Sequence, residues 1–438
     1  ENFMGMNASD YGGGTPVTDI WRKDVGVAVG HTEVVPKRVS LPVQLDMNGS
    51  KAEIGIYGTN TRKIMSRDTL ELPATFFLVH TGDYYAALQN YSRFMQEKGI
   101  TINEPSDASY EPVWCAWGYE RDFVVDEVVQ TLPKVKELGF EWAVIDDGWQ
   151  PAEGDWYPWK KKFPNGEKGM KDLVQEIHDK GLKAKLWWAP LAADPESELY
   201  KKHPDMVLIN QKGTTQDISW WDSYYMCLAY EKTIDYSRKL VEKFIGEWKF
   251  DGLKIDGQHL NAAPPCYNPA HNHTNPSESY ERLPEFWKMV YETAKELNPE
   301  AVIEICPCGT ACSFYIMPWM DQPFSSDPLS SWQIRLKGKT YKALMGPHTA
   351  YYGDHVELSD GGMDFASTVG IGGVVGSKFT WPNDRLSHND NLLTNEKETL
   401  WQKWNDLYLH YMLPKGEYIG HAYDIGYDKP EGHLIKKG

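Results

Sequence analysis

The sequence has few cysteines for its length and lacks any long apolar run. Six cysteines in 438 residues, three of them close together, do not form the pattern of a disulfide framework. No stretch approaches the roughly 18 uninterrupted apolar residues of a membrane-spanning helix, so no membrane partner is expected. Basic residues are outnumbered by 62 acids to 45, which gives a net charge of −17. This charge disfavours nucleic acid and favours a neutral partner.

Compartment and assembly are less well defined by the sequence. The first residue is Glu rather than Met, and no charged-then-apolar leader follows it. We interpret this as a signal peptide that has been removed or lies outside the sequence, so a secreted or periplasmic location is favoured over a cytoplasmic one. The composition is compatible with a homo-oligomer and does not decide the matter.

Aromatic residues are abundant, at 13% of the chain, with 18 Trp and 25 Tyr. Such rings stack on the CH faces of sugars, although most of them are expected in a core. In residues 1–108, β-branched and aromatic runs broken by Gly, Asn and Pro predict antiparallel strands, followed by a helix over 84–98 and a linker. Residues 426–438 resemble the opening strand of a further β domain.

From residue 112 the pattern changes to short apolar strands separated by long amphipathic helices, which is typical of parallel βα units. About eight units predict an α/β fold in which residues 109–425 form a (β/α)8 TIM barrel. The expected strands are 113–117, 142–146, 184–189, 252–256, 301–306, 323–326, 349–352 and 370–376, and the expected helices are 124–138, 170–180, 231–248, 278–297 and 400–410.

Polar side chains gather where these strands end. In such a barrel the working residues stand at the carboxyl ends of the strands, because that face carries the long variable loops. Alternation along 250–256 places Lys254 and Asp256 on one face of their strand, and a neighbouring cation would keep the carboxylate ionised as a nucleophile. Asp327 follows the sixth strand. Cleavage of a glycosidic bond needs two carboxyl groups, and these two can supply the pair.

Each acid also has a plainer interpretation. Asp256 could cap the following loop, although the Lys two residues earlier and the Gly that follows speak for a site. Asp327 lies in Ser-Asp-Pro, which is ordinary turn chemistry. Asp146 and Asp147 could grip two neighbouring hydroxyls or hold Ca²⁺ or Mg²⁺, but no further acidic spacing completes a shell of six oxygens.

Two further groups of residues lie in or after the predicted third and fourth strands. His259, Cys266, His271 and His273 follow the fourth strand, but their spacing fits no regular zinc pattern, so a loop that covers the substrate is favoured over a metal site. Trp187 and Trp188 cannot both face the barrel interior. We expect Trp188 and Trp117 to be the sugar-facing rings, since large rings at strand ends stay partly open.

Together these motifs resemble glycoside hydrolase clan D, and most closely family 36, over about residues 112–380. The resemblance is carried by Trp114-Cys-Ala-Trp117, Ile145-Asp-Asp-Gly-Trp-Gln150, Asp251-Gly-Leu-Lys-Ile-Asp-Gly257, Glu304-Ile-Cys-Pro-Cys-Gly309 and Ser326-Asp327. The first two are similar to raffinose synthases and seed-imbibition-type α-galactosidases. Family members also carry an N-terminal β-sandwich and a small C-terminal β domain, which implies that 1–108 and 426–438 are parts of such domains.

The resemblance implies a role for each of these residues. Asp256 would be the nucleophile and Asp327 the general acid/base, about 5 to 7 Å apart across the mouth. Asp146 and Asp147 would hold O4 and O6 of a galactose-like ring, Lys254 would be the sugar-binding lysine, and Cys306 and Gly309 would lie near O2. Members hydrolyse terminal α-galactosides of oligosaccharides or glycans with retention and need no cofactor, so neither a cofactor nor a metal is expected in this site.

Departures from the family pattern leave alternatives open. Gly309-Thr-Ala-Cys312 replaces the glycine run and Arg of typical bacterial α-galactosidases, so N-acetylgalactosamine or another 2-substituted sugar is a candidate. Pro-Leu-Ser-Ser after Asp327 leans toward raffinose synthases, which transfer galactose to a sugar acceptor. A barrel that binds carbohydrate without catalysis is the third hypothesis, and the presence of both carboxylates argues against it.

Overall fold

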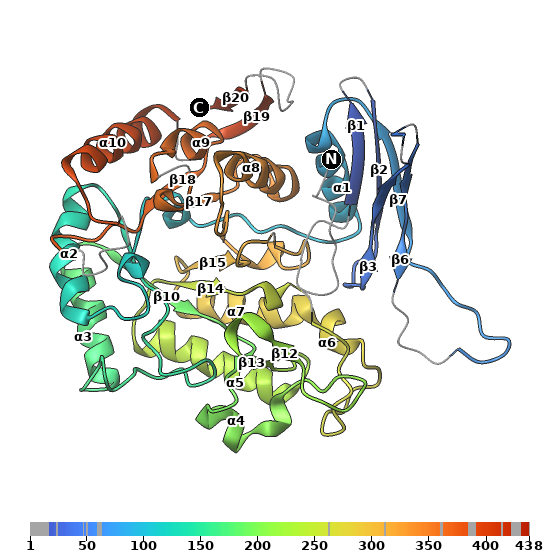
Figure 1. Cartoon of the computed structure of the whole chain (residues 1–438), viewed down its shortest axis with the longest axis horizontal. Helices are drawn as coiled ribbons and strands as arrows, with labels where there is room; N and C mark the ends of the chain where they lie inside the picture. Colours follow the sequence, from blue (N-terminus) through green and yellow to red (C-terminus); the bar gives the residue numbers. More distant parts are fainter. Residues whose placement is uncertain are drawn as a thin grey trace.

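Eight parallel strands form the centre of the molecule (Figure 1). The computed structural model describes residues 17–22, 25–46, 48–49, 51–58, 64–261, 263–310, 312–359, 362–383, 391–412, 415–421 and 431–437. The strand order is β16-β15-β14-β10-β9-β8-β18-β17. The two edge strands meet through a single parallel bridge between Phe324 and Tyr352, which brings the sheet round into a ring. The predicted TIM barrel is therefore confirmed. Its strands are β8 (Val113–Cys115), β9 (Trp142–Ile145), β10 (Lys183–Trp188), β14 (Gly252–Asp256), β15 (Val302–Cys306), β16 (Gln322–Pro323), β17 (Tyr352–His355) and β18 (Val374–Ser377).

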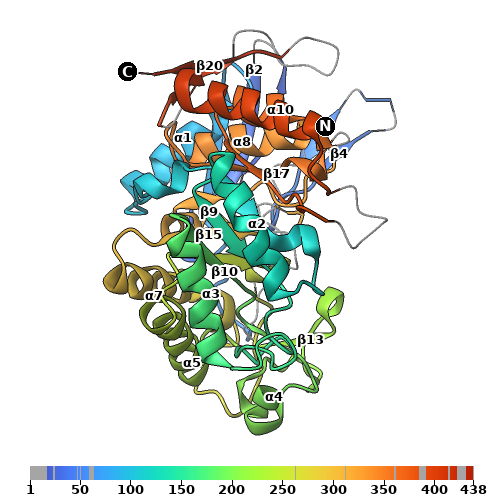
Figure 2. The same ribbon diagram turned by 90° about the vertical axis from the view of Figure 1, so that its left-hand side faces the viewer.

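Helices cover the outside of this ring, as α2 and α3 do beside β9 and β10 in Figure 2. Their apolar faces pack on the strands, and the stack of Phe140 on Trp401, with ring centroids 3.8 Å apart, joins the ring to its last helix. Within the described chain, the helices are too short or too polar to cross a membrane. The bounds are α2 (Val125–Glu137), α3 (Glu167–Asp179), α5 (Glu231–Val241) continued by the π-helix η5 (Glu242–Glu247), α6 (Glu278–Glu281), α7 (Leu283–Leu297), α8 (Ser331–Met345), α9 (Phe365–Gly370) and α10 (Asn395–Asp406) continued by η10 (Leu407–Met412).

Helix α8 was not predicted because its pattern is not amphipathic. It carries lysines that are buried, and each finds a partner from outside the helix. Lys339 pairs with Asp83, and Lys342 donates to the carbonyl of Thr349 at 3.3 Å. Burial lowers the pKa of Lys342 to about 7. Contacts between distant segments, rather than a local apolar stripe, therefore stabilise this helix.

The seventh and eighth strands lie later in the sequence than expected. β17 begins at Tyr352, where the prediction ended, and β18 begins at Val374 rather than at residue 370, which is the last residue of α9. Gly353 permits β17 to approach α9 closely, because a Cβ at this position would lie 2.4 Å from the hydroxyl oxygen of Thr368. The shift extends the seventh strand to include Asp354.

An antiparallel sheet of β1 (Val17–Arg22), β2 (Val25–His31) and β7 (Thr75–His80) stands beside the barrel, with α1 (Tyr84–Glu97) between it and α8 (Figure 1). Asp83 caps α1 by accepting from the Tyr85 amide at 3.0 Å, and the same carboxylate pairs with Lys339. Smaller pairs are β3 (Val39–Ser40) with β6 (Tyr57–Gly58), β4 (Val43–Leu45) with β5 (Ala52–Ile54), and β19 (Glu417–His421) with β20 (His433–Lys436). The domain boundaries at residues 108 and 425 stay predictions.

An insertion after β10 forms a small sheet of its own. Strands β11 (Ala192–Ala193), β13 (Ser223–Tyr225) and β12 (Asp217–Ile218) pair in that order, and α4 (Glu198–Lys202) lies with them at the lower end of the molecule in Figures 1 and 2. The short 3₁₀ helix η4 (Ser219–Trp221) connects β12 to β13. This insertion lies at the carboxyl end of the barrel strands and so forms part of the rim.

A buried ion pair lies inside the barrel, below the strand ends. Lys185 of β10 pairs with Glu304 of β15, and both side chains are fully inaccessible to solvent. The Lys185 ammonium also donates to the side-chain oxygen of Gln322 at 3.0 Å. Strands β10, β15 and β16 thus share one network of polar contacts across the barrel interior, which fixes their inward faces relative to one another.

We expect Lys185→Met to lower the free energy of unfolding by about 3 to 5 kcal/mol, because Glu304 would be left as an unpaired buried charge. Chemical denaturation measures the change. Lys168→Met is the matched control, since Lys168 pairs with Asp172 on the surface and should cost less than about 1 kcal/mol. Equal losses in the two variants would contradict a special role for the buried pair.

Candidate active site

The nucleophile predicted at the end of β14 lies among neighbouring strand ends. Strand β14 runs between β10 and β15, and Asp256 is level with Cys306. Its Oδ2 atom accepts a hydrogen bond from the indole Nε1 of Trp187 at 3.0 Å. Burial raises the pKa of Asp256 to about 7, while Lys254 and the Trp187 bond lower it and Asp327 and Asp146 raise it further. The carboxylate thus titrates near neutrality.

Lys254 points to the same interior face, as the alternation predicted, but it pairs with a different acid. Its ammonium lies 2.6 Å from Oδ2 of Asp146, which also accepts from the Cys115 thiol at 2.9 Å. Burial lowers the pKa of Lys254, but Asp146, the neighbouring Cys115 and Cys306 groups and Asp256 outweigh it and raise this pKa well above its usual value. Lys254 therefore acts on Asp256 through space and contacts Asp146 directly.

Asp146 and Asp147 diverge, as two successive side chains at a strand end should. Asp147 turns toward Arg121, whose Nε lies 3.1 Å from its Oδ2, and accepts from the Gln150 amide at 2.8 Å. Burial raises the pKa of Asp147, and the Arg121 charge partly offsets this effect. A second acid, Glu153, lies 3.3 Å from the same guanidinium. Asp146 and Asp147 therefore present their carboxylates to different parts of the barrel mouth.

Asp327 follows β16 in a strained turn. Ser326 and Asp327 have φ values of 60° and 45°, in the left-handed region, and the Asp327 side chain is exposed. The hydroxyl of the preceding Ser326 lies 3.3 Å from the sulfur of Cys306, which is in register with Asp256, so the two acids stand at the same end of the barrel. The charge of Asp327 also raises the pKa of Asp256. The separation of 5 to 7 Å and the catalytic roles of both acids stay predictions.

Asp354 was missed by the sequence analysis. It lies on β17, is 2% exposed, and accepts from the backbone amides of Asp327 at 2.7 Å and His355 at 2.6 Å. Burial and the charge of Asp327 raise its pKa to about 7. Its φ of 74° is strained for a residue with a side chain. Extending the expected seventh strand by two residues would have placed this acid at the mouth.

Cys306 and Gly309 lie against the turn that carries Asp327. The Ser326 hydroxyl accepts from the Gly309 amide at 2.7 Å and lies 3.3 Å from the Cys306 sulfur. The Lys337 ammonium of α8 donates to the carbonyls of Ser325 and Ser326 at 2.6 and 3.0 Å. Burial, followed by the charges of Asp256 and Asp327, raises the pKa of the Cys306 thiol well above its usual value. These contacts therefore connect the segments that follow β15 and β16.

The two rings predicted to face the sugar have different positions. Trp188 is fully buried and packs on Phe244 of η5, so it faces the helix layer, and the structure contradicts its expected exposure at the mouth. Trp187 points inward with Lys185 and contacts Asp256 instead, because β10 has a two-residue period. Trp117 lies in the 3₁₀ helix η2 (Ala116–Tyr119) after β8 and is half-buried. Its contact with sugar stays a prediction.

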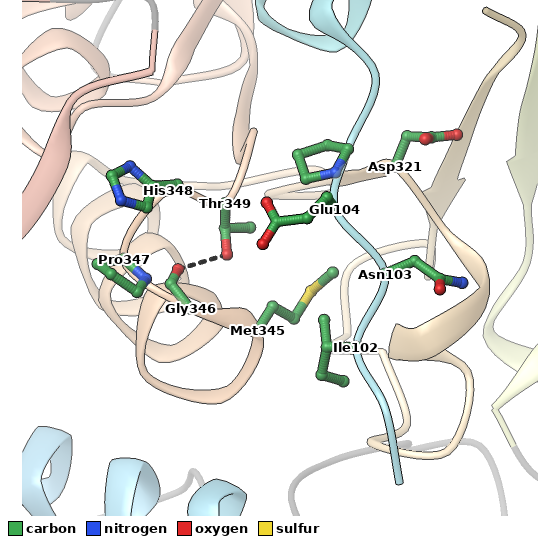
Figure 3. A pocket seen from close by; sticks show the side chains of 10 residues that line it. Ile102, Asn103, Glu104, Asp321, Met345, Gly346, Pro347, His348 and Thr349 are labelled. Atoms are coloured by element: carbon green, nitrogen blue, oxygen red, sulfur yellow. Dashed lines mark hydrogen bonds between the residues drawn. The ribbon is translucent and has the colours of Figure 1, made fainter. Parts of the chain in front are cut away.

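A pocket at the opposite end of the barrel is unrelated to these acids. Figure 3 shows Glu104 on the segment that enters the barrel, together with Asp321, which precedes β16, and Thr349, which precedes β17. Those positions lie where strands begin. The carboxylates described above lie where strands end, so the pocket belongs to the other face.

Comparisons with known proteins agree with this geometry. The Melibiase family model matches residues 90–373. An A type blood α-D-galactosamine galactosaminidase from Flavonifractor plautii is 31% identical over 432 residues, which make up 96% of this chain and 38% of that protein. α-Galactosidase Mel36A from Lactobacillus acidophilus is 43% identical over 142 residues, 31% of this chain and 19% of that protein. This chain thus spans less than half the length of these curated relatives.

Solved structures show the same fold. The α-galactosidase of Thermus thermophilus in complex with stachyose superposes with a TM-score of 0.63 at 20% identity, over 89% of this chain and 80% of that one. A family 36 α-galactosidase, AgaA from Geobacillus stearothermophilus, in complex with raffinose gives a TM-score of 0.62 at 17% identity, over 92% of this chain and 57% of that one. The family model covers residues 90–373, and this range includes all of the acids described above. The chain therefore belongs to the Melibiase family, as its motifs implied.

Proposed function

We propose that this barrel is the catalytic part of a retaining α-glycosidase that removes terminal α-galactose, or a galactose-like sugar, from oligosaccharides or glycans. The observation that carries the proposal is geometric: in a Melibiase-family barrel, Asp256 is in register with Cys306, whose sulfur lies 3.3 Å from the hydroxyl of Ser326, the residue before Asp327. Two carboxyl groups that share a mouth are the arrangement that double displacement requires.

In the first step the Asp256 carboxylate attacks the anomeric carbon from the β face. A bond forms between the carboxylate oxygen and that carbon, the glycosidic bond breaks, and Asp327 donates its proton to the leaving oxygen. In the second step Asp327 takes a proton from water, the water oxygen bonds to the anomeric carbon, and Asp256 leaves as a carboxylate. Two inversions give a product with retained α configuration.

The surroundings of Asp256 suit a nucleophile near neutral pH. Its burial favours the protonated form, whereas Lys254 and the Trp187 indole favour the ionised form. These opposing effects place the pKa at about 7. The attacking form therefore predominates above neutrality, and the acid limb of kcat/KM should reflect this ionisation.

The separate polar surfaces of Asp146 and Asp147 support selection for an axial O4. Asp146 presents a carboxylate already paired with Lys254, and Asp147 presents one paired with Arg121. Two paired acids side by side can each accept from a sugar hydroxyl without leaving a buried charge unmatched. We propose that they hold O4 and O6, with Lys254 donating to the same ring.

A free amine at the sugar's C2 is a second candidate substituent. By the family resemblance, C2 would lie near Cys306, where burial raises the thiol's pKa and the charges of Asp256, Asp327 and Asp354 raise it further, while Lys254 lowers it. The same negative potential would favour an ammonium group. The galactosaminidase that is 31% identical to this chain supports this choice. Rates on aryl α-galactoside, α-galactosaminide and α-N-acetylgalactosaminide decide among the three sugars.

A transglycosylase of the raffinose synthase type would use the same two acids with a sugar acceptor in place of water. Product analysis with galactinol and sucrose distinguishes transfer from hydrolysis. A binding protein without catalysis would titrate with galactose by calorimetry and show no turnover.

Chemical rescue tests the two assigned roles against each other. Asp256→Gly should lose turnover of an activated aryl α-galactoside by at least about 10³-fold, and azide should restore it with a β-glycosyl azide as product. Asp327→Gly should instead give the α-azide, because the anion attacks the β-linked enzyme intermediate. Product anomers are assigned by NMR. If Asp256→Gly retains full activity, or if both variants give the same anomer, the assignment is wrong.

Trp187→Phe should move the acid limb of kcat/KM to higher pH, by on the order of one unit, because it removes a hydrogen bond that lowers the pKa of Asp256. The pH profile on one aryl substrate measures the shift. Trp188→Phe is the control, since that ring faces the helix layer and should leave the limb in place. A limb that stays at its original pH in Trp187→Phe would contradict this account.

Asp354→Ala should reduce kcat about 10- to 100-fold on substrates with poor leaving groups, because it removes the acceptor that fixes the Asp327 amide. Activated aryl substrates need less proton donation and should lose less. Asp354→Asn keeps an acceptor oxygen and should recover much of the difference. An equal loss on both substrate types would indicate general unfolding instead of misplacement of Asp327.

A further inference from the structure

Four metal-ligating side chains converge outside the carboxylate mouth. The ligand atoms of Cys227, Cys266, His271 and His273 all lie within 4.8 Å of one another. Cys227 follows β13 in the insertion after β10, whereas the other three belong to the loop between β14 and α6. The cluster therefore joins two segments that are distant in sequence.

The spacings suit tetrahedral coordination. The Cys227 sulfur lies 3.2 Å from Nε2 of His273, and the Cys266 sulfur lies 3.3 Å from Nδ1 of His271. With Zn–S bonds of about 2.3 Å and Zn–N bonds of about 2.0 Å, neighbouring ligand atoms in a tetrahedron lie about 3.3 to 3.8 Å apart. A small adjustment of the four atoms, whose separations now reach up to 4.8 Å, makes room for one ion.

The second nitrogen of each imidazole already has a partner of the kind found at metal sites. Nε2 of His271 donates to the backbone carbonyl of Asp205 at 2.7 Å, which leaves Nδ1 turned to the cluster. Nδ1 of His273 lies 3.4 Å from a carboxylate oxygen of Glu278, which leaves Nε2 turned to the cluster. Such outer contacts select the tautomer that binds metal and hold the ring in place.

The cluster is enclosed and its parts are held rigidly. Cys227 and Cys266 are 0% and 2% exposed, and the Tyr230 ring stacks on His271 with centroids 4.1 Å apart. The Tyr230 hydroxyl in turn donates to the side chain of Asp205 at 3.1 Å. Two thiols and two imidazoles form the donor set that zinc prefers, and four protein ligands leave no open position for substrate.

We propose that Cys227, Cys266, His271 and His273 bind one structural Zn²⁺. The ion fastens the insertion after β10 to the loop after β14, and both segments form the rim of the barrel. This inference revises the sequence interpretation, in which His259 belonged to the group and Cys227 did not. His259 lies elsewhere, with its Nε2 atom 2.7 Å from the carbonyl of Pro190. Cys227 could not be assigned from spacing, because it reaches the cluster only through the fold.

The site is tested on the unaltered protein, produced without a metal-binding tag. Mass spectrometry of metals should find about one zinc per chain after gel filtration. After chelation, Co²⁺ should restore the stoichiometry and give the visible absorption of a tetrahedral thiolate complex. Protein that contains no zinc and takes up neither ion, with Cys227 and Cys266 joined as a disulfide or both freely alkylated, would overturn the proposal.

Substitutions locate the ion. Cys266→Ser and His271→Gln should each lose at least about nine-tenths of the bound zinc, since three ligands hold it far less tightly than four. Cys312→Ser and His410→Gln are matched controls, because these residues lie outside the cluster and should retain zinc. If the zinc content of Cys266→Ser and His271→Gln equals that of the controls, the ion lies elsewhere and the proposal fails. Metal content does not depend on turnover, so this result is independent of the catalytic assignment.

Discussion

The ammonium of Lys254 is the charge on which the mouth of this barrel depends. It pairs directly with Asp146 and opposes the repulsion that Asp256 receives from Asp327 and Asp146. It also lowers the pKa of Asp354 on β17, the strand that meets β16 through the single bridge that closes the ring. Without this cation, the buried carboxyl groups of Asp256 and Asp354 would have still higher pKa values, because nothing would oppose their burial and the charge of Asp327 to the same degree. One lysine thus favours the ionised form of acids at two strand ends.

Local patterns predicted the parts of the fold that local forces determine. Short apolar strands and amphipathic helices identified the barrel, and the two-residue period placed Lys254 and Asp256 on one interior face, as the structure shows. The same period could not say which of Trp187 and Trp188 faces inward, because both residues are apolar. That choice depends on Lys185, whose pairing with Glu304 fixes the inward face of β10.

The features that the sequence did not predict depend on contacts between distant segments. Helix α8 has no apolar stripe and is stabilised by partners for its buried lysines. β17 lies three residues later than predicted and so includes Asp354, which accepts a hydrogen bond from the Asp327 amide in the neighbouring turn. Cys227 joins its three partners across 39 residues of chain. The periodicity of a sequence cannot predict contacts between segments that are far apart along the chain.

The ring is closed unevenly, and this has a consequence for how such enzymes can diversify. Asp256 lies within an uninterrupted ladder from β10 through β15, whereas a single bridge joins β16 to β17, next to Asp327. Sequence changes at that seam can move Asp327, the proposed proton donor, while the ladder keeps Asp256, the proposed nucleophile, in place. On the proposed mechanism, selection can therefore adapt the barrel to new leaving groups or acceptors with little effect on the bond that Asp256 forms.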